Sequence, residues 1–271
     1  MFSRSWNLAK SSWSVIAANP ELLWLPILSG ISVVVVIAAP SVVLGSIVVG
    51  DGAQNPLAWA LIALITYLAA VVGIYFQVAT VWAANEHFEG RDPTLSSSFA
   101  AANGHLGQIA GWAVLVTAIR LVGAFLRQRG TIGAIAGGLL DALWAFASFL
   151  VVPAIVLAGM GPIDALKHST VSLRQTWGEN IIGRVGLGAL GFLAFLALLP
   201  VFALAVWAAT GGSGVLALVV GVIGVVLLAL AGVLTAVLSG VYQTALFRYA
   251  ESGDTVGPFS GAQLAGGFRT R

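Results

Sequence analysis

Several apolar runs in this chain exceed the roughly 18–20 residues needed to cross a hydrocarbon core about 30 Å thick. Only 8% of the residues are charged, whereas soluble domains carry about a quarter, so most of the chain cannot face water. The runs are continuous and do not alternate between apolar and polar residues, which indicates helices. The sequence therefore predicts an all-α, polytopic membrane protein.

The apolar runs predict six transmembrane helices within a single integral membrane domain that covers residues 1–271. The predicted spans are 22–49, 57–84, 106–126, 131–160, 181–209 and 215–247. Some spans are longer than the bilayer is thick, so we expect tilted or kinked helices. The expected kink sites are Pro40, Pro153 and Pro200.

The distribution of Lys and Arg predicts how the chain is oriented. The connections near 50–56 and 210–214 contain neither residue type, whereas the alternate connections and both ends are basic. Nine Lys and Arg residues lie on the predicted cytoplasmic side. Two arginines, Arg127 and Arg129, lie on the opposite side. We therefore expect a multi-pass protein of the bacterial cytoplasmic membrane with both termini in the cytoplasm.

Two segments have the pattern of helices that lie in the membrane interface. In the first, Phe2, Trp6, Ala9, Trp13 and Ile16 share one helical face. A similar stripe returns as Leu166, Thr170, Leu173 and Trp177, followed by Ile181 one position late. The expected interfacial anchors are Trp6, Lys10, Trp13, Lys167, Arg174 and Trp177.

The likeness between these segments indicates an internal repeat. Gln77 and Ala79 also match Gln243 and Ala245 at an offset of 166. The predicted unit is one amphipathic, cytoplasmic-side interfacial helix followed by a transmembrane hairpin, used three times. The predicted copies are 1–94, 95–160 and 161–258, with a short cytoplasmic tail at 259–271. The middle copy has the weakest match.

Three segments carry a resemblance to a known family: SRSWNLAKSSWSVI, FQVATVWAANEHFEGRDPTLSSSF and GPIDALKHSTVSLRQTWGENIIG. They resemble an uncharacterised bacterial integral-membrane family, the domain of unknown function numbered 6159. The chain is more remotely similar to the membrane domain fused to some glycerophosphodiester phosphodiesterases. The resemblance implies a six-helix integral membrane fold. It implies no reaction, because the family has no established one.

Arg120 and Asp141 are the main candidates for functional charged residues inside the predicted spans. Arg120 lies ten residues before Gly130 and Asp141 eleven after it. If the hairpin turns at Gly130, both lie about 15 Å from its outer end. Charges at such depth often pair, so we expect an ion pair. Its role is open between a structural lock and a substrate anchor or proton-coupling pair.

Gln77 and Gln243 are the expected intramembrane polar residues of the second and sixth spans. The simplest interpretation is that each amide makes an interhelical hydrogen bond, worth about 0.6 kcal/mol in membrane proteins. The alternative is that they line a pore or binding site.

The sequence gives no support for an enzyme. It contains no cysteine and no HExxH pair, although Glu86, His87, Glu89 and His105 lie near one another in sequence. Ser213 stands in a G-x-S-G match, but every histidine precedes it and it falls in a short turn. We therefore expect no catalytic, metal or cofactor-binding residue, and no cofactor.

Two functions remain compatible with these residues. The first is a non-catalytic membrane scaffold or accessory subunit that binds membrane lipids or a partner membrane protein. The alternative is a small permease or transporter for a neutral or lipidic substrate. Few charged groups underlie the net charge of +2, so no nucleic-acid partner is expected.

Overall fold

The computed structural model describes residues 23–51, 56–177, 196, 198–201, 203–204, 206–208, 210–211 and 213–253. Over these residues the protein is helical and has no strand, which confirms the predicted all-α class. The helices are α2 (Trp24–Asp51), α3 (Pro56–Phe88), α4 (Leu95–Gly104), α5 (Leu106–Arg127), α6 (Gly130–Ala147), α7 (Val151–Ala158), α8 (Pro162–Trp177) and α10 (Gly214–Ser252).

Three segments of the described chain are long and apolar enough to cross a membrane: Pro56–Phe88, Leu106–Arg127 and Gly130–Ala158. They correspond to the second, third and fourth predicted spans. The first and sixth predicted spans correspond to α2 and α10, and most of the fifth lies outside the described residues. The apolar helices therefore associate the chain with a membrane.

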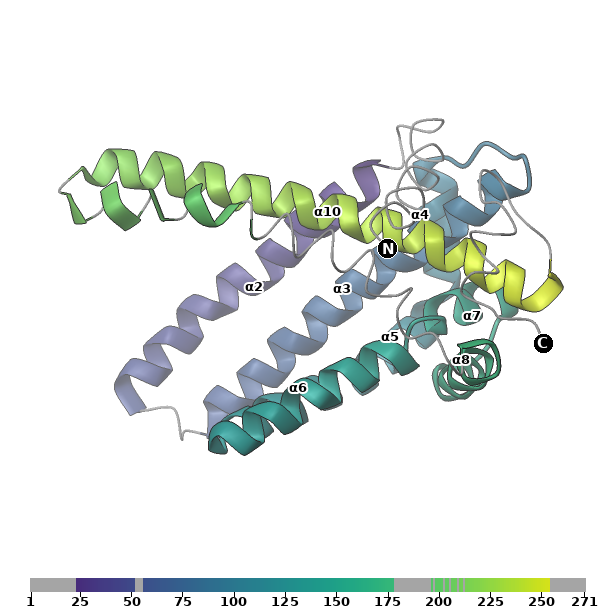
Figure 1. Cartoon of the computed structure of the whole chain (residues 1–271), viewed down its shortest axis with the longest axis horizontal. Helices are drawn as coiled ribbons and strands as arrows, with labels where there is room; N and C mark the ends of the chain where they lie inside the picture. Colours follow the sequence, from purple (N-terminus) through teal and green to yellow (C-terminus); the bar gives the residue numbers. More distant parts are fainter. Residues whose placement is uncertain are drawn as a thin grey trace.

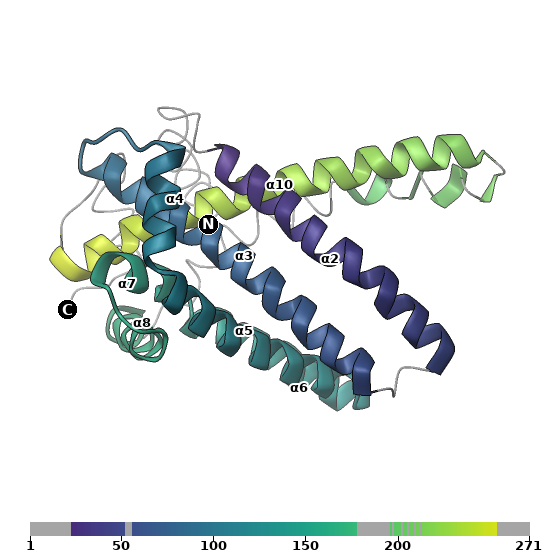
Figure 2. The same ribbon diagram turned by 180° about the vertical axis from the view of Figure 1, so that it is seen from behind.

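The helices are arranged as an open, splayed bundle (Figures 1 and 2). Among consecutive helices, α2 packs most extensively against α3 and α5 against α6, and α10 packs on α3, α2 and α7. At one end, the last turns of α3 and α10 meet α4, α7 and α8; we call this the converging end. At the splayed end, α10 diverges from α3, α5 and α6.

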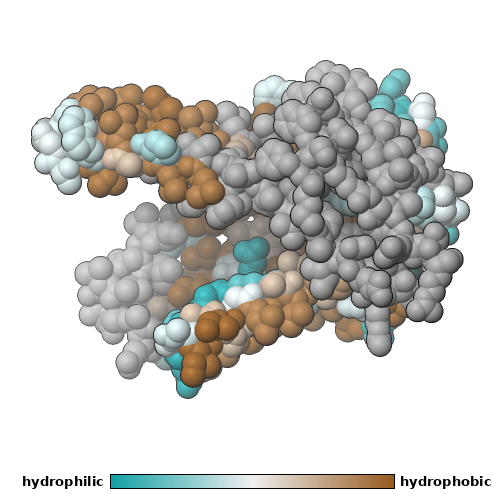
Figure 3. Space-filling view, viewed as in Figure 1, coloured by the Kyte–Doolittle hydropathy of each residue, from teal (hydrophilic) through white to brown (hydrophobic). Residues whose placement is uncertain are grey.

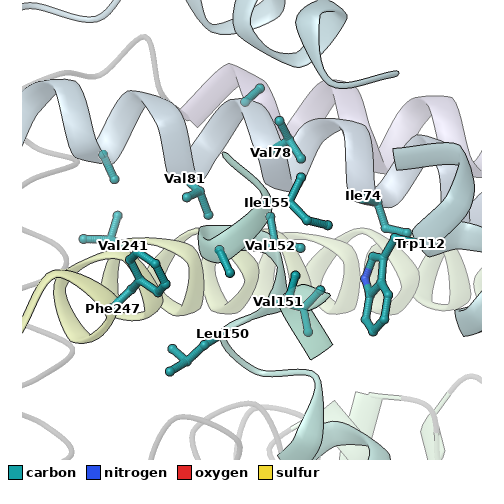
Figure 4. Close-up of a cluster of buried hydrophobic side chains, with 14 of the residues drawn as sticks. Ile74, Val78, Val81, Trp112, Leu150, Val151, Val152, Ile155, Val241 and Phe247 are labelled. Carbon is teal, nitrogen blue, oxygen red and sulfur yellow. The ribbon is translucent and has the colours of Figure 1, made fainter. Parts of the chain in front are cut away.

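The hydrophobic core lies at the converging end, where most of the helices meet (Figure 4). Side chains from several helices meet in it, among them Val78 of α3, Trp112 of α5, Ile155 of α7 and Val241 of α10. Trp112 stacks on Trp144, with ring centroids 5.2 Å apart. This end therefore holds the helices in their relative positions.

Large apolar side chains are exposed on the rest of the bundle. On α6, Ile132 is 84% exposed and Ile135 is 67% exposed. Such exposure would be costly in water, but it suits a helix in contact with acyl chains. Figure 3 shows that apolar surface dominates both arms of the splayed end.

The fourth predicted span is interrupted where it approaches Pro153. Helix α6 ends at Ala147, residues 148–150 form a turn, and α7 starts at Val151. Proline has no N–H to donate to the carbonyl four residues earlier, and its ring crowds that carbonyl. The kink predicted at Pro153 is therefore confirmed as a break, whereas α2 continues through Pro40.

The break leaves the backbone N–H of Leu150 without a partner in its own helix, and α8 supplies one. The Leu150 N–H donates to the Ser169 hydroxyl oxygen at 3.1 Å, and Ser169 is fully buried. The buried positions of α8 are Ala165, Ser169 and Leu173. The predicted membrane-facing stripe shares only Leu173 with this buried face, and its orientation toward a membrane stays a prediction.

Glycines allow α5 and α6 to approach closely. A Cβ atom on Gly133 would collide with the Leu126 carbonyl oxygen, and one on Gly137 would lie 2.9 Å from Cγ of Arg127. Both glycines are buried although most of α6 is exposed. The contact between α5 and α6 therefore depends on residues without side chains, as is common in membrane helices.

Candidate functional site

A network of polar side chains joins the ends of α3 and α10 at the converging end. Arg248 Nη1 donates to Asn85 Oδ1 at 2.8 Å and to Glu89 Oε1 at 2.9 Å. Asn85 Nδ2 also donates to Glu89 Oε1, at 3.0 Å. Arg91 bonds to Glu89 and to Glu86, with Nε 2.5 Å from Glu86 Oε2. One carboxylate, Glu89, thus accepts hydrogen bonds from three side chains.

These contacts change the titration of the charged groups outside the helices. Partial burial alone would raise the pKa of Glu89, but hydrogen bonds from Asn85, Arg91 and Arg248 lower it below its usual value. Hydrogen bonds to Glu86 and Glu89 raise the pKa of Arg91. These hydrogen bonds therefore favour the charged forms of Glu89 and Arg91.

A pocket of about 230 Å³ adjoins this network. Its lining residues are Asn85, Glu89, Leu157, Phe247, Arg248, Glu251 and Ser252. His168 of α8 lies beside it, with Nε2 2.9 Å from Glu251 Oε1 and its ring 5.8 Å from that of Phe247. The lining combines polar and charged groups with the apolar Leu157 and Phe247, and the volume suits a headgroup or a side chain.

The two predicted intramembrane glutamines meet directly. Gln77 Nε2 donates to Gln243 Oε1 at 3.1 Å. Gln243 is buried and Gln77 is partly buried. The expected interhelical hydrogen bond is thereby confirmed, and each glutamine is the partner of the other. Close packing supports this contact, because a Cβ on Gly240 would lie 3.1 Å from Cγ2 of Thr80.

The predicted pairing of Arg120 with Asp141 is wrong. Asp141 Oδ2 lies 2.5 Å from Nη1 of Arg127, and both side chains are about half exposed. The Arg127 side chain passes Gly137 and Gly123, where missing Cβ atoms leave room for it. Side chains of a helix point toward its N-terminus, so Arg127 extends down the hairpin to a carboxylate at a greater depth.

The predicted interfacial anchors are only partly visible. Trp6, Lys10 and Trp13 lie outside the described residues. Arg174 and Trp177 belong to α8, but their side chains lie outside the described part. Lys167 is exposed and lies 3.2 Å from Asp164.

The sequence did not identify the pocket at the converging end. Glu89 was considered as part of a metal site; instead it binds Asn85, Arg91 and Arg248. In the described chain no group of three or more His, Asp or Glu residues could hold a metal ion. Asn85 and Arg248 are 163 residues apart, so no local motif could reveal their contact.

A family model matches residues 57–257 of the chain, and that family is described as a family of unknown function, DUF6159. No curated protein and no solved structure matches the chain. The matched range includes α3, the central hairpin, the pocket and α10.

Proposed function

Because the chain belongs to DUF6159, a family of unknown function, its role must be inferred from its own geometry. We propose that it is a non-catalytic scaffold or accessory subunit of the bacterial cytoplasmic membrane. It crosses the membrane six times, with the converging end and both termini on the cytoplasmic side. It binds membrane lipids or a partner membrane protein.

The distribution of charge supports the proposed orientation. Arg91, Lys167 and Arg248 lie at or near the converging end, and Arg127 and Arg129 lie at the splayed end. The positive-inside tendency applies to short connections, and more of the described basic residues at the two ends of the bundle lie at the converging end.

One observation carries the scaffold proposal: the polar groups between α3 and α10 bond to one another. Gln77 bonds to Gln243, and Arg248 bonds to Asn85 and Glu89. A transport route through this contact would need polar groups that can exchange their partners for a substrate. Groups that already satisfy one another instead fix the two helices at one distance, which suits a scaffold.

The converging end offers a surface for a cytoplasmic or membrane partner. On α8, Ile163 and Val171 are 59% and 51% exposed, and Lys167 is exposed between them. This mixed surface adjoins His168, which contacts Glu251 at the pocket. Apolar residues flanked by charge are typical of interaction surfaces.

Co-purification from native membranes tests this proposal. The tagged full-length protein is extracted, and the proteins and lipids that accompany it are identified by mass spectrometry. A membrane protein of similar size carrying the same tag is the control. We expect a reproducible protein or lipid partner that the control lacks. Recovery of neither contradicts a scaffold role.

The hollow at the splayed end supports the alternative, a permease for a neutral or lipidic substrate (Figure 3). Reconstitution into liposomes distinguishes the two functions. A scaffold leaves the flux of neutral solutes and of fluorescent lipids at the level of protein-free liposomes. Flux that depends on the protein supports the permease.

A further inference from the structure

Arg120 lies on the inner face of α5, not on its lipid-facing side. Counted around the helix, it shares a face with Ala113 and Thr117, which are buried. Val114 and Val122, which are 55% and 49% exposed, lie on the opposite face. The Arg120 side chain is therefore directed toward the interior of the bundle.

Arg120 is nevertheless exposed. The helices diverge toward the splayed end. From Thr117 to the splayed end, the inner face of α5 is therefore no longer covered by the diverging helices. Figure 3 shows a hollow between the α10 arm and the α5–α6 pair, with hydrophilic side chains along its α5–α6 edge. On the other side of the hollow, apolar surface makes up most of the α10 arm. The hollow thus combines an apolar lining with a polar edge.

The charges of the α5–α6 hairpin do not balance. Residues 106–147 contain three arginines, Arg120, Arg127 and Arg129, and one carboxylate, Asp141. Asp141 is engaged by Arg127, and no described carboxylate forms an ion pair with Arg120. An arginine that faces an apolar space without a counter-ion is costly, so this position favours an anion.

A second polar group lies one turn from Arg120. The Thr117 hydroxyl is buried and has no hydrogen-bond partner among the described residues. Most buried hydroxyls are hydrogen-bonded. Arg120 and Thr117 therefore share one face of α5, with the hydroxyl buried and the cation exposed.

We propose that Arg120 binds the phosphate of an anionic phospholipid whose acyl chains occupy the hollow between α5–α6 and α10. A guanidinium forms two parallel hydrogen bonds with a phosphate, and the apolar lining suits acyl chains. The extra negative charge of an acidic phospholipid offsets the excess cations of the hairpin. This inference rests on the proposed membrane-embedded function, and it adds the lipid class and the site.

The depth of Arg120 makes the site distinct from ordinary contact with the bilayer surface. Arg120 lies seven residues, or about 10 Å, deeper along α5 than Arg127. A phosphate at Arg120 therefore leaves the headgroup layer and enters the hollow. A lipid held there is expected to remain with the protein through purification, whereas annular lipids exchange.

Native mass spectrometry of the full-length protein in detergent tests the proposal. The protein is incubated with equal amounts of phosphatidylglycerol and phosphatidylethanolamine, and the retained lipid is identified. We expect the wild type to retain phosphatidylglycerol selectively and Arg120→Gln to retain at least about tenfold less, because a charge-assisted contact is lost. Arg129→Gln is the matched control, since Arg129 lies over Phe125 at the exposed turn. It should retain as much as the wild type.

Equal retention of phosphatidylglycerol by the wild type and Arg120→Gln overturns the proposal, and so does equal retention of the two lipids by the wild type. A crosslink between Arg120 and a carboxylate of a partner protein also overturns it, because that carboxylate would then occupy the place of the phosphate. If Arg120→Gln does not fold, the wild type alone decides: phosphatidylglycerol must raise its melting temperature more than phosphatidylethanolamine does. Solute flux in liposomes would refute the scaffold function and leave this lipid site intact, so the two failures can be distinguished.

Discussion

The side-chain nitrogen of Gln77 donates to the side-chain oxygen of Gln243 at 3.1 Å and so joins two residues 166 positions apart. Helices α3 and α10 both run toward the converging end (Figure 1). Matching positions of two parallel helices meet when a local two-fold axis runs between them. This contact is the one expected if the first and last repeat copies arose by duplication, and the duplication itself stays a prediction.

Replacing either glutamine by leucine should destabilise the protein, because the remaining amide loses its partner. We expect the two substitutions to be coupled by about 0.6 kcal/mol, the average for interhelical hydrogen bonds in membranes. Unfolding of Gln77→Leu, Gln243→Leu and the double variant in mixed detergent micelles measures this coupling. Thr66→Val paired with Gln243→Leu is the control, because Thr66 bonds to its own helix. Strictly additive effects of the two glutamine substitutions would argue against the contact.

Removing Asp141 should leave Arg127 without its counter-ion. We expect Asp141→Leu to lower the free energy of unfolding by roughly 1 kcal/mol, the upper end for pairs that are not fully buried. The double variant Arg127→Leu with Asp141→Leu should recover part of this loss, since a lone charge is worse than none. Arg120→Leu should change the free energy of unfolding by the same amount in the wild type and in Asp141→Leu, because Asp141 pairs with Arg127 and not with Arg120. A different effect of Arg120→Leu in the two backgrounds would restore the pairing predicted from the sequence.

A methyl group at Gly138 should leave the α5–α6 contact intact, whereas a methyl group at Gly133 should disrupt it. A Cβ on Gly133 meets the Leu126 carbonyl oxygen, whereas one on Gly138 meets no atom within 4 Å. Gly133→Ala should therefore separate the helices and lower the melting temperature, because the backbone must move. Gly138→Ala should be neutral or stabilising by at most about 1 kcal/mol, the difference in helix propensity. Equal melting temperatures of the two variants would exclude the close approach at Gly133.

Ser169→Ala should destabilise the junction of α6 and α7 by about 1–3 kcal/mol, the cost of leaving a buried donor unsatisfied. The donor is the Leu150 backbone N–H. Its hydrogen exchange should become faster in the variant. Thr170→Ala is the matched control, because the Thr170 hydroxyl bonds to the Lys167 carbonyl of the same helix. Unchanged exchange at Leu150 in Ser169→Ala would show that another group satisfies this amide.

The contribution of Glu89 to stability should disappear in acid. Its pKa in the folded protein lies below its ordinary value of 4.5, so the stabilising effect is complete above that value. It is lost as the pH falls through the folded pKa. Glu89→Gln should melt at a lower temperature than the wild type at pH 7, and the difference should shrink toward pH 4. Asp92→Asn, at an exposed neighbouring carboxylate, should show no such narrowing.

The helices could be predicted from the sequence because continuous apolar runs are a local property. The predicted spans 57–84 and 106–126 begin within one residue of α3 and α5. The Pro153 break was also predictable, since the missing donor belongs to the residue itself. Interhelical hydrogen bonds of Gln77 and Gln243 were also predictable, because amides within apolar spans need partners, but that each is the partner of the other is a finding of the structure.

Other features depended on the reach of side chains and on contacts between distant segments. Asp141 pairs with Arg127 because two glycines leave space for the long arginine side chain to extend along the hairpin. The prediction chose Arg120 instead, because Arg120 and Asp141 lie at similar distances from the turn. The network of Asn85, Glu89 and Arg248 requires that two helix ends meet. Ser169 accepts a hydrogen bond from the backbone of a segment 19 residues away, and no local pattern indicates such a contact.

The contact between Leu150 and Ser169 also sets an order of events during synthesis. The amide of Leu150 gains its partner only after the ribosome has passed Ser169 and α8 has docked on α7. Until then, the segment from Leu150 to Ala158 carries an unsatisfied donor that disfavours hydrocarbon. The segment from Leu150 to Ala158 therefore depends on α8, a helix that is synthesised after it. In a nascent chain that stops before Ser169, the Leu150 N–H has no partner from α8.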